Sequence, residues 1–159
     1  MSQTTNQIGL ENSDVKELID KLNDLLANYQ VFYQNTRGFH WNIKGHKFFE
    51  LHVKFEELYD DLHAKIDEIA ERILTLGGTP LHSFADYTSI SDVKAIKDAS
   101  EDVACVTGVL DALKVLLVKQ RVILDLSDKM DDEGTNAMAS DYIREQEKLV
   151  WMYSSWLNK

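Results

Sequence analysis

Helix breakers are scarce in this sequence: Pro80 is its only proline, and seven glycines are spread over 159 residues. Both residue types destabilise the interior of an α-helix, so their scarcity leaves room for long, uninterrupted helices. Apolar residues recur three and four positions apart along most of the chain, which is the period of one buried helix face. The length suits a single domain with one sizeable core. The sequence therefore predicts an all-helical domain.

The boundaries of four long helices follow from this periodicity. We expect them over roughly residues 13–41, 48–76, 103–129 and 135–157, with Ser13 at the start of the first and Thr135 capping the last. Gly77, Gly78 and Pro80 form a strong stop signal after the second helix. The connector that follows is too long for a simple turn, and we expect one short helix in it, near residues 91–97. Four long helices with one long middle crossover favour an all-α, ferritin-like four-helix bundle with a short extra helix in the crossover.

The first twelve residues differ in character from the rest. They are polar, nearly uncharged and aperiodic, so we expect residues 1–12 to form a flexible N-terminal tail and residues 13–159 to form the domain. They lack the positive start and apolar stretch of a secretory signal, and no run of about eighteen apolar residues predicts a membrane span. Cys105 is the only cysteine and has no partner for an internal disulfide, which fits a reducing cytosol. We therefore expect a cytoplasmic protein without a membrane partner.

Acidic residues outnumber basic ones, with 27 Asp and Glu against 17 Lys and Arg, and the formal net charge is −10. Such a surface repels the phosphate backbone of a nucleic acid unless a local basic patch overrides it. The first basic residue is Lys16, so the tail before it carries no positive charge, and the C-terminus adds only Lys159. We therefore expect no appreciable DNA binding.

Five candidate metal ligands stand out. They are His40 near the end of the first helix, and His52, Glu56, Asp67 and Glu71 on the second. His52 and Glu56 are four residues apart, as are Asp67 and Glu71, so the members of each pair share a helix face. At about 100° per residue around the helix axis, with His52 at zero, Glu56, Asp67 and Glu71 lie at about 40°, 60° and 100°. All four therefore occupy one stripe of the second helix.

The four side chains of this stripe cannot bind the same metal ion within one chain. His52 and Asp67 are separated by about 22 Å of helix, whereas metal–ligand bonds are about 2 Å long. The two pairs meet if the second helices of two subunits pack antiparallel about a twofold axis. Two identical sites then form about 20 Å apart, and His40 completes the nitrogen ligands of each. The spacing thus favours a metal site shared between subunits.

The donor chemistry narrows the choice of metal. Two imidazoles with several carboxylates and no thiolate suit Fe(II), Mn or Zn better than copper or an iron–sulfur cluster. A carboxylate-rich site also stabilises Fe(III) and so favours oxidation. The alternative is that these pairs are solvated surface groups, as His–Glu and Asp–Glu pairs at helical spacing usually are. Spacing alone leaves both interpretations open.

At these residues the sequence resembles the Dps family of mini-ferritins, the DNA-binding proteins from starved cells. The likeness runs from about Ser13 to the C-terminus, and its segments are FHWNIKG at 39–45, FFELHVKFEELYDDLHAKIDEIAERILTLGGTP at 48–80 and KLVWMYSSWL at 148–157. The resemblance implies a hollow homo-dodecamer of four-helix subunits. It also implies a ferroxidase site that binds iron through His40, His52 and Glu56 of one subunit and Asp67 and Glu71 of its neighbour.

The resemblance implies a function as well. Dps-like proteins typically bind Fe(II), oxidise it, preferably with hydrogen peroxide, and store ferric mineral inside the shell, which protects against oxidative stress. The Glu-x-x-His pattern of classical ferritin sites is absent here. Two alternatives stay open. One is an architectural protein that compacts DNA, against which the missing basic tail counts; the other is a scaffold that kept the fold and lost the chemistry, against which the five intact ligands count.

Further residues surround the expected site. Trp41 resembles a tryptophan beside the site in relatives, although packing at a dimer interface explains it equally well. His63 lies at about 20° on the stripe, either as a partner that orients ligands or as an interface or surface residue. In relatives the start of the last helix lines negative pores, which implies pore roles for Asp131, Asp132, Glu133 and Asp141; the alternative is a capped, solvated helix start. Candidates for mineral nucleation on the inner surface of the shell are Glu57, Asp60 and Asp61; the alternative is a solvated charged face.

Overall fold

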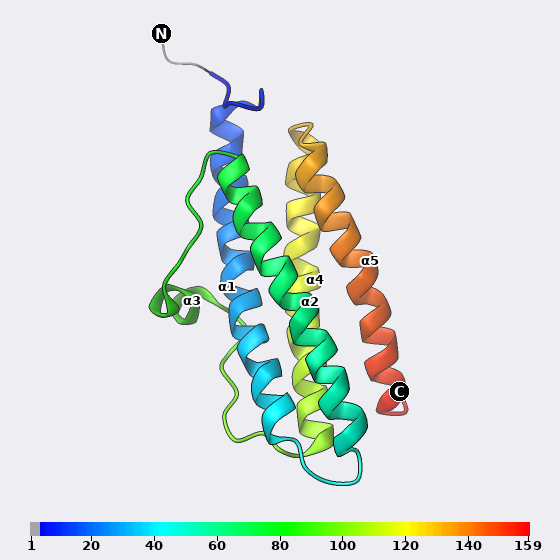
Figure 1. The fold of residues 1–159 in the computed structure, drawn as a ribbon. Helices are drawn as coiled ribbons and strands as arrows, with labels where there is room; N and C mark the ends of the chain where they lie inside the picture. The colour runs from blue at the N-terminus through cyan, green and yellow to red at the C-terminus, as the bar shows by residue number, and fades with distance from the viewer. Residues whose placement is uncertain (1–3) are drawn as a thin grey trace.

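The computed structural model describes residues 4–159, and it is a bundle of four long helices with one short helix beside it (Figure 1). The elements are α1 (Asn12–Asn42), α2 (Phe48–Thr75), α3 (Phe84–Ile90), α4 (Asp102–Lys129) and α5 (Glu133–Trp156). Helix α1 packs along α2, and α4 packs along α5, while α1 also contacts α4 and α3. The expected four-helix bundle, with a short helix in the crossover between its second and third long helices, is confirmed. Within residues 4–159, no helix combines the length and the apolar character needed to span a membrane.

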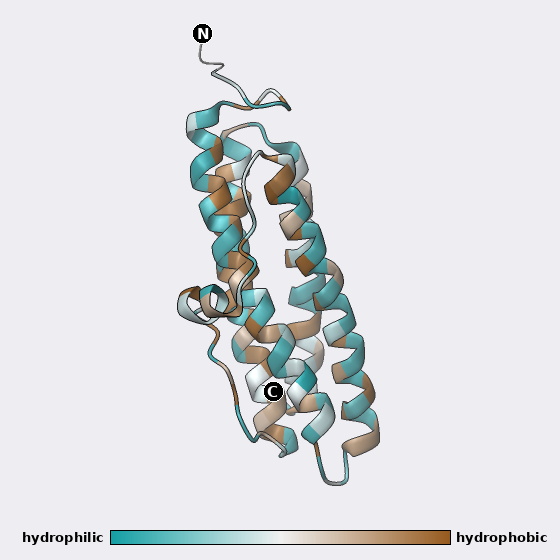
Figure 2. Cartoon of the chain, turned by 60° about the vertical axis from the view of Figure 1, so that its left-hand side comes forward, coloured by the Kyte–Doolittle hydropathy of each residue, from teal (hydrophilic) through white to brown (hydrophobic). Residues whose placement is uncertain are grey.

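The core lies between the four long helices, each of which carries both apolar and polar residues around its surface (Figure 2). One polar cluster sits inside it. The hydroxyl of Tyr29 donates to Gln120 (2.5 Å), the amide of Gln120 donates to Gln146 (2.8 Å), and the amide of Gln146 donates back to Tyr29 (2.7 Å). The three residues are buried, and their closed ring of hydrogen bonds ties α1, α4 and α5 together.

Helix ends agree with the expected bounds to within a few residues, but the caps differ. Helix α1 begins at Asn12 and has Glu11 as its N-cap, so Ser13 lies in its first turn. Helix α5 is capped by Asp132, whose carboxylate accepts from the backbone N–H of Thr135. The expectation that Thr135 is the cap is therefore wrong: an aspartate three residues earlier takes that position, where its side chain satisfies a free N–H of the first turn.

The short helix of the crossover is the larger discrepancy. It spans Phe84–Ile90, not residues 91–97, and Ser83 caps it by accepting from the backbone N–H of Asp86. Residues 91–97 instead run along α1, because Asn28 accepts from the backbone of residues 92 and 93, and Asn35 bonds the backbone of residues 94 and 96. These side chains from a distant helix replace the hydrogen bonds of a local helix.

The described part of the expected tail forms a turn. The side chain of Asn6 accepts from the backbone N–H groups of Ile8 and Leu10 and donates to the carbonyl of Leu76, at the end of α2. Thr5 and Glu11 form an isolated antiparallel bridge. The rest of the expected tail, at residues 1–3, lies outside the described residues. Flexibility of this segment in solution stays a prediction.

Candidate metal centre

His40 and His52 lock each other in place. Nδ1 of His40 donates to the backbone carbonyl of His52 (2.6 Å), and Nδ1 of His52 donates to the carbonyl of His40 (2.7 Å). The two rings stack with their centroids 3.8 Å apart and their planes 13° from parallel. Since a carbonyl only accepts, each Nδ1 carries a proton, and in the neutral ring each Nε2 then keeps its lone pair. That is the tautomer in which a histidine binds a metal through Nε2.

The chain reversal between α1 and α2 produces this arrangement. His40 lies in the last turn of α1 and His52 near the start of α2, and the connection between them turns at Gly45, whose φ is 107°. Aromatic rings close the pair on both sides: Phe48 stacks on His52 at 4.9 Å, and Tyr59 meets the ring of His40 edge-on at 5.3 Å. The imidazoles are therefore fixed by backbone acceptors and by packing before any metal arrives.

Glu56 follows His52 by one helical turn and is exposed. Desolvation raises the pKa of the nearby Tyr59 hydroxyl, and the charges of Glu56 and Asp60 raise it further, while Arg37 opposes them. Tyr59 is therefore neutral at physiological pH. It does not compete with Glu56 as an anionic ligand.

Asp67 and Glu71 lie toward the other end of α2, and both are exposed. Their carboxylates make no hydrogen bond or ion pair with residues 4–159. Across that range, no three His, Cys, Asp or Glu side chains are placed to hold one metal ion. The structure therefore brings His40 and His52 together but leaves the acidic pair apart, about 22 Å along the helix from His52. One chain therefore contains two separate parts of the candidate metal site, a histidine part and an acidic part, and neither is complete by itself.

Three aromatic rings beside the site surround an arginine, and two of them, Tyr33 and Tyr59, were not anticipated. The guanidinium of Arg37 lies 4.7 Å from the ring of Trp41, 5.4 Å from Tyr33 and 6.0 Å from Tyr59. Trp41 itself is 56% exposed. Arg37, Tyr33 and Trp41 are spaced four residues apart on α1, and this spacing is the signal that predicts their contact.

His63 is exposed, and its ring lies 5.7 Å from that of Tyr33. It makes no hydrogen bond to His40, His52 or any other residue in the described part of the chain. Within one subunit it therefore does not orient a ligand. The other two histidines, His46 and His82, lie exposed in loops.

The four pore candidates divide into two kinds. Asp131, Glu133 and Asp141 are exposed. Asp132 is only 3% exposed, and its carboxylate binds the guanidinium of Arg72 at 2.6 Å. A carboxylate buried and neutralised inside its own subunit is not available to line an opening, so Asp132 has a structural role. The other three stay candidates for a pore.

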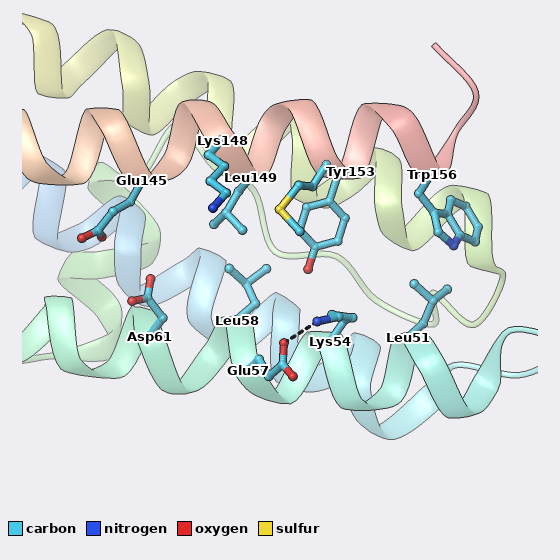
Figure 3. A pocket seen from close by; sticks show the side chains of 11 residues that line it. Leu51, Lys54, Glu57, Leu58, Asp61, Glu145, Lys148, Leu149, Tyr153 and Trp156 are labelled. Atoms are coloured by element: carbon cyan, nitrogen blue, oxygen red, sulfur yellow. Dashed lines mark hydrogen bonds and ion pairs between the residues drawn. The ribbon is translucent and has the colours of Figure 1, made fainter.

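A groove of about 410 Å³ lies between α2 and α5, away from the ligand stripe (Figure 3). Its walls are largely apolar, and the acids along it are paired: Glu57 binds Lys54 at 2.9 Å, and the buried Lys65 binds both Asp61 (2.7 Å) and Glu145 (2.8 Å). Burial alone lowers the pKa of Lys65, but the hydrogen bonds from these two acids raise it, so the lysine stays charged. Of the three nucleation candidates, only Asp60 is left without a cationic partner in residues 4–159.

Cys105 is buried in the core. Desolvation raises the pKa of its thiol to about 11, and the charges of Glu101 and Asp102 add to this effect. The thiolate is the form that binds metals, so Cys105 is not a candidate ligand at neutral pH.

Comparison with known proteins agrees with the fold. A model of the ferritin-like domain matches residues 19–159. Together with the four-helix bundle and its histidine and carboxylate stripe, this match defines a ferritin-like protein. The crystal structure of a Dps protein from Vibrio cholerae O1, described as a member of a broad superfamily of ferritin-like diiron-carboxylate proteins, has 54% sequence identity and a TM-score of 0.97, with 99% of both chains covered. A DNA protection during starvation protein from Porphyromonas gingivalis is 40% identical over 95% of each chain. The chain belongs to the Dps family of the ferritin-like superfamily.

A further relative, an uncharacterised protein from Haemophilus influenzae, is 55% identical and covers 98% of this chain and 96% of its own length. The name of the Porphyromonas protein refers to DNA protection. The expectation that this chain does not bind DNA therefore gains no support from the comparisons. It stays a prediction that rests on charge.

Proposed function

We propose that this chain assembles into a cytoplasmic dodecameric mini-ferritin that oxidises Fe(II), preferably with hydrogen peroxide, and stores the ferric product in its cavity. Iron is the substrate of this reaction, and the sites lie between subunits related by a twofold axis. Each site takes His40, His52 and Glu56 from one subunit and Asp67 and Glu71 from its neighbour. Protection against oxidative stress follows, because both iron and peroxide are consumed.

The histidine pair is the observation that carries this proposal. His40 is buried and His52 is half-buried, and Nδ1 of each ring donates to the backbone carbonyl of the other residue. The Nε2 lone pairs of both neutral rings therefore stay available to a metal. Core histidines that serve packing alone have no need of this reciprocal arrangement, whereas metal-binding histidines are commonly oriented by a backbone carbonyl. The exposed and unpaired carboxylates on the same stripe supply the hard oxygen donors that stabilise Fe(III).

The redox balance fits this donor set. One peroxide takes one electron from each of two Fe(II) ions and two H⁺ ions from solution. It leaves as two water molecules, and both irons become Fe(III). Hydroxyl radical is avoided when both electrons arrive at the same peroxide. The carboxylates of Glu56, Asp67 and Glu71 offset the charge gained by the iron.

Replacing both histidines tests the proposal. H40G/H52G removes both imidazoles and is expected to slow peroxide-dependent Fe(II) oxidation by about 10–100-fold, while the particle mass stays that of the wild type. The matched control is H46G/H82G, which removes two exposed loop histidines and is expected to keep the wild-type rate. An unchanged rate in an assembled H40G/H52G shell would reject the shared site.

DNA protection is a second candidate function, favoured by the name of the Porphyromonas relative. The net charge of −10 and the absence of basic residues before Lys16 oppose direct DNA contact. Consumption of iron and peroxide protects DNA without binding it. We therefore infer that any protection of DNA by this chain is chemical.

A further inference from the structure

Helices α2 and α5 are joined by polar side chains along only one half of their length. Lys65 of α2 binds Glu145 at 2.8 Å, and Arg72 of α2 binds Asp132, the cap of α5, at 2.6 Å. Before Lys65, no α2 side chain makes a hydrogen bond or ion pair with α5 in the described part of the chain. The groove of about 410 Å³ occupies that other half, near the start of α2 and the end of α5 (Figure 3).

The groove lies on a different side of α2 from the proposed iron ligands. At about 100° per residue, with His52 at zero, the groove residues Glu57, Asp61, Lys54 and Leu58 lie at about 140°, 180°, 200° and 240°. The ligand stripe extends only from zero to about 100°. A contact between subunits along the ligand stripe therefore leaves the groove uncovered.

The walls of the groove are apolar side chains from both helices. They are Leu51 and Leu58 from α2 and Leu149, Met152 and Trp156 from α5. The α2 leucines are buried beneath the groove, whereas Met152 at its edge is 44% exposed. Apolar surface of this kind gains free energy when the apolar part of a ligand covers it.

Two groups that open onto the groove have hydrogen-bonding capacity left over. Lys148 is exposed and makes no hydrogen bond or ion pair within residues 4–159. The hydroxyl of Tyr153 makes no hydrogen bond within the same range. Burial raises the pKa of this hydroxyl, and the charge of Glu57 raises it further, so the group stays protonated and can donate. Figure 3 shows the Lys148 ammonium and the Tyr153 hydroxyl both directed from α5 into the groove.

The acids along the groove, in contrast, already have partners. Lys54 binds Glu57 at 2.9 Å, and Lys65 binds both Asp61 and Glu145. Within residues 4–159, the one charge of the lining without a partner is therefore positive. A carboxylate would meet an ammonium and a hydroxyl that are both available to it, whereas a cation would compete with lysines for its acceptors. Charge complementarity thus favours an anionic ligand with an apolar body.

We propose that the groove between α2 and α5 binds a small amphipathic carboxylate, namely a medium-chain fatty acid in its free form. Its carboxylate accepts from Lys148 and Tyr153, and its alkyl chain lies over Met152 and Trp156. Lys148 and Trp156 are separated by about 12 Å of helix, which limits the length of the chain that the groove covers. This binding involves no iron, so the inference goes beyond the proposed function and does not rest on it.

Titration of the assembled protein with octanoate tests the proposal, and isothermal titration calorimetry measures the affinity. We expect saturable binding at one site per chain. Hexanoate and butanoate are each expected to bind about threefold to tenfold more weakly than the acid two methylenes longer, because less apolar surface is covered. Octylammonium has the same chain and the opposite charge, and is expected to bind at least about tenfold more weakly than octanoate. Tighter binding of octylammonium, or an affinity that does not change with chain length, would overturn the proposal.

Variants of the two donors locate the site. K148E is expected to weaken octanoate binding about tenfold or more, and Y153F about threefold to tenfold, while circular dichroism shows unchanged helix content. K16E is the matched control: it changes the net charge by the same amount at an exposed position of α1 and is expected to keep the wild-type affinity. Wild-type affinity in K148E, or an equal loss in K148E and K16E, contradicts the proposed site. Absence of octanoate binding to the wild type, as expected if a second copy of the chain covers the groove, also overturns it.

Discussion

Two faces of α2 carry carboxylates, and they differ in what those carboxylates bind. On the side of α5, Glu57 is bound by Lys54 (Figure 3). On the same side, Asp61 is bound by Lys65. On the ligand stripe, Asp67 and Glu71 have no hydrogen bond or ion pair in residues 4–159. The charge of a paired carboxylate is already neutralised by a lysine of the same chain, whereas an unpaired carboxylate is available to bind a metal cation. The same residue type on one helix thus serves structure on one face and chemistry on the other.

The largest loss of stability is expected from substitutions on the side of α2 that faces α5, where the carboxylates are bound by lysines. Lys65 is only 5% exposed, and Asp61 and Glu145 accept its hydrogen bonds. D61A/E145A leaves this ammonium buried without an acceptor and is expected to lower the free energy of unfolding by about 2–4 kcal/mol. This is less than the penalty for a wholly buried pair, because the two acids are themselves half exposed. Chemical denaturation measures the loss, and the oxidation rate per assembled shell is expected to stay within about twofold of the wild type.

E57A is the matched control on the same face. It removes the partner of Lys54, and both side chains of that pair are more than half exposed, so the expected loss is below about 1 kcal/mol. If E57A and D61A/E145A lower the free energy of unfolding by the same amount, burial of Lys65 is not the reason why its interaction with Asp61 and Glu145 stabilises the fold.

The smallest effect is expected in DNA binding, because the acidic residues of both faces of α2 contribute to the net charge of −10, which repels the phosphate backbone. We expect no retardation of plasmid DNA at neutral pH and physiological salt without added divalent metal. A gel-shift titration measures this, with a basic DNA-binding protein as the positive control. A retarded band shows that the assembled shell presents a basic patch despite the acidic surface of each subunit.

Much of this molecule could be predicted from local sequence. The four long helices follow from apolar periodicity and from few breakers, and the ligand stripe follows from helical spacing on α2. Both depend on residues within a few turns of each other. The position of α3 could not be predicted in this way, because Asn28 and Asn35 of α1 bind residues that lie more than fifty positions later.

The site shows the same limit. Spacing predicts that His40 and His52 approach each other, but it does not reveal that each Nδ1 binds the other's backbone carbonyl. Likewise, Asp132 looked like one of four equivalent pore acids, whereas the structure pairs it with Arg72 from α2. Long-range partners decide which of several similar side chains is free to act.

The central claim is that one iron site needs two chains, and mixed shells test it most directly. Two parents are each expected to oxidise Fe(II) about 10–100-fold more slowly than the wild type: H40G/H52G, which keeps the acidic half, and D67N/E71Q, which keeps the histidine half. Co-expression of the two chains with different tags produces mixed shells.

In a twofold pair made of one chain of each kind, one of the two sites receives both intact halves and the other receives neither. Random pairing makes half of the pairs mixed, so the shells are expected to recover about a quarter of the wild-type rate. Recovery to that level supports a site shared between subunits. A mixture that stays at the rate of its inactive parents would contradict the account.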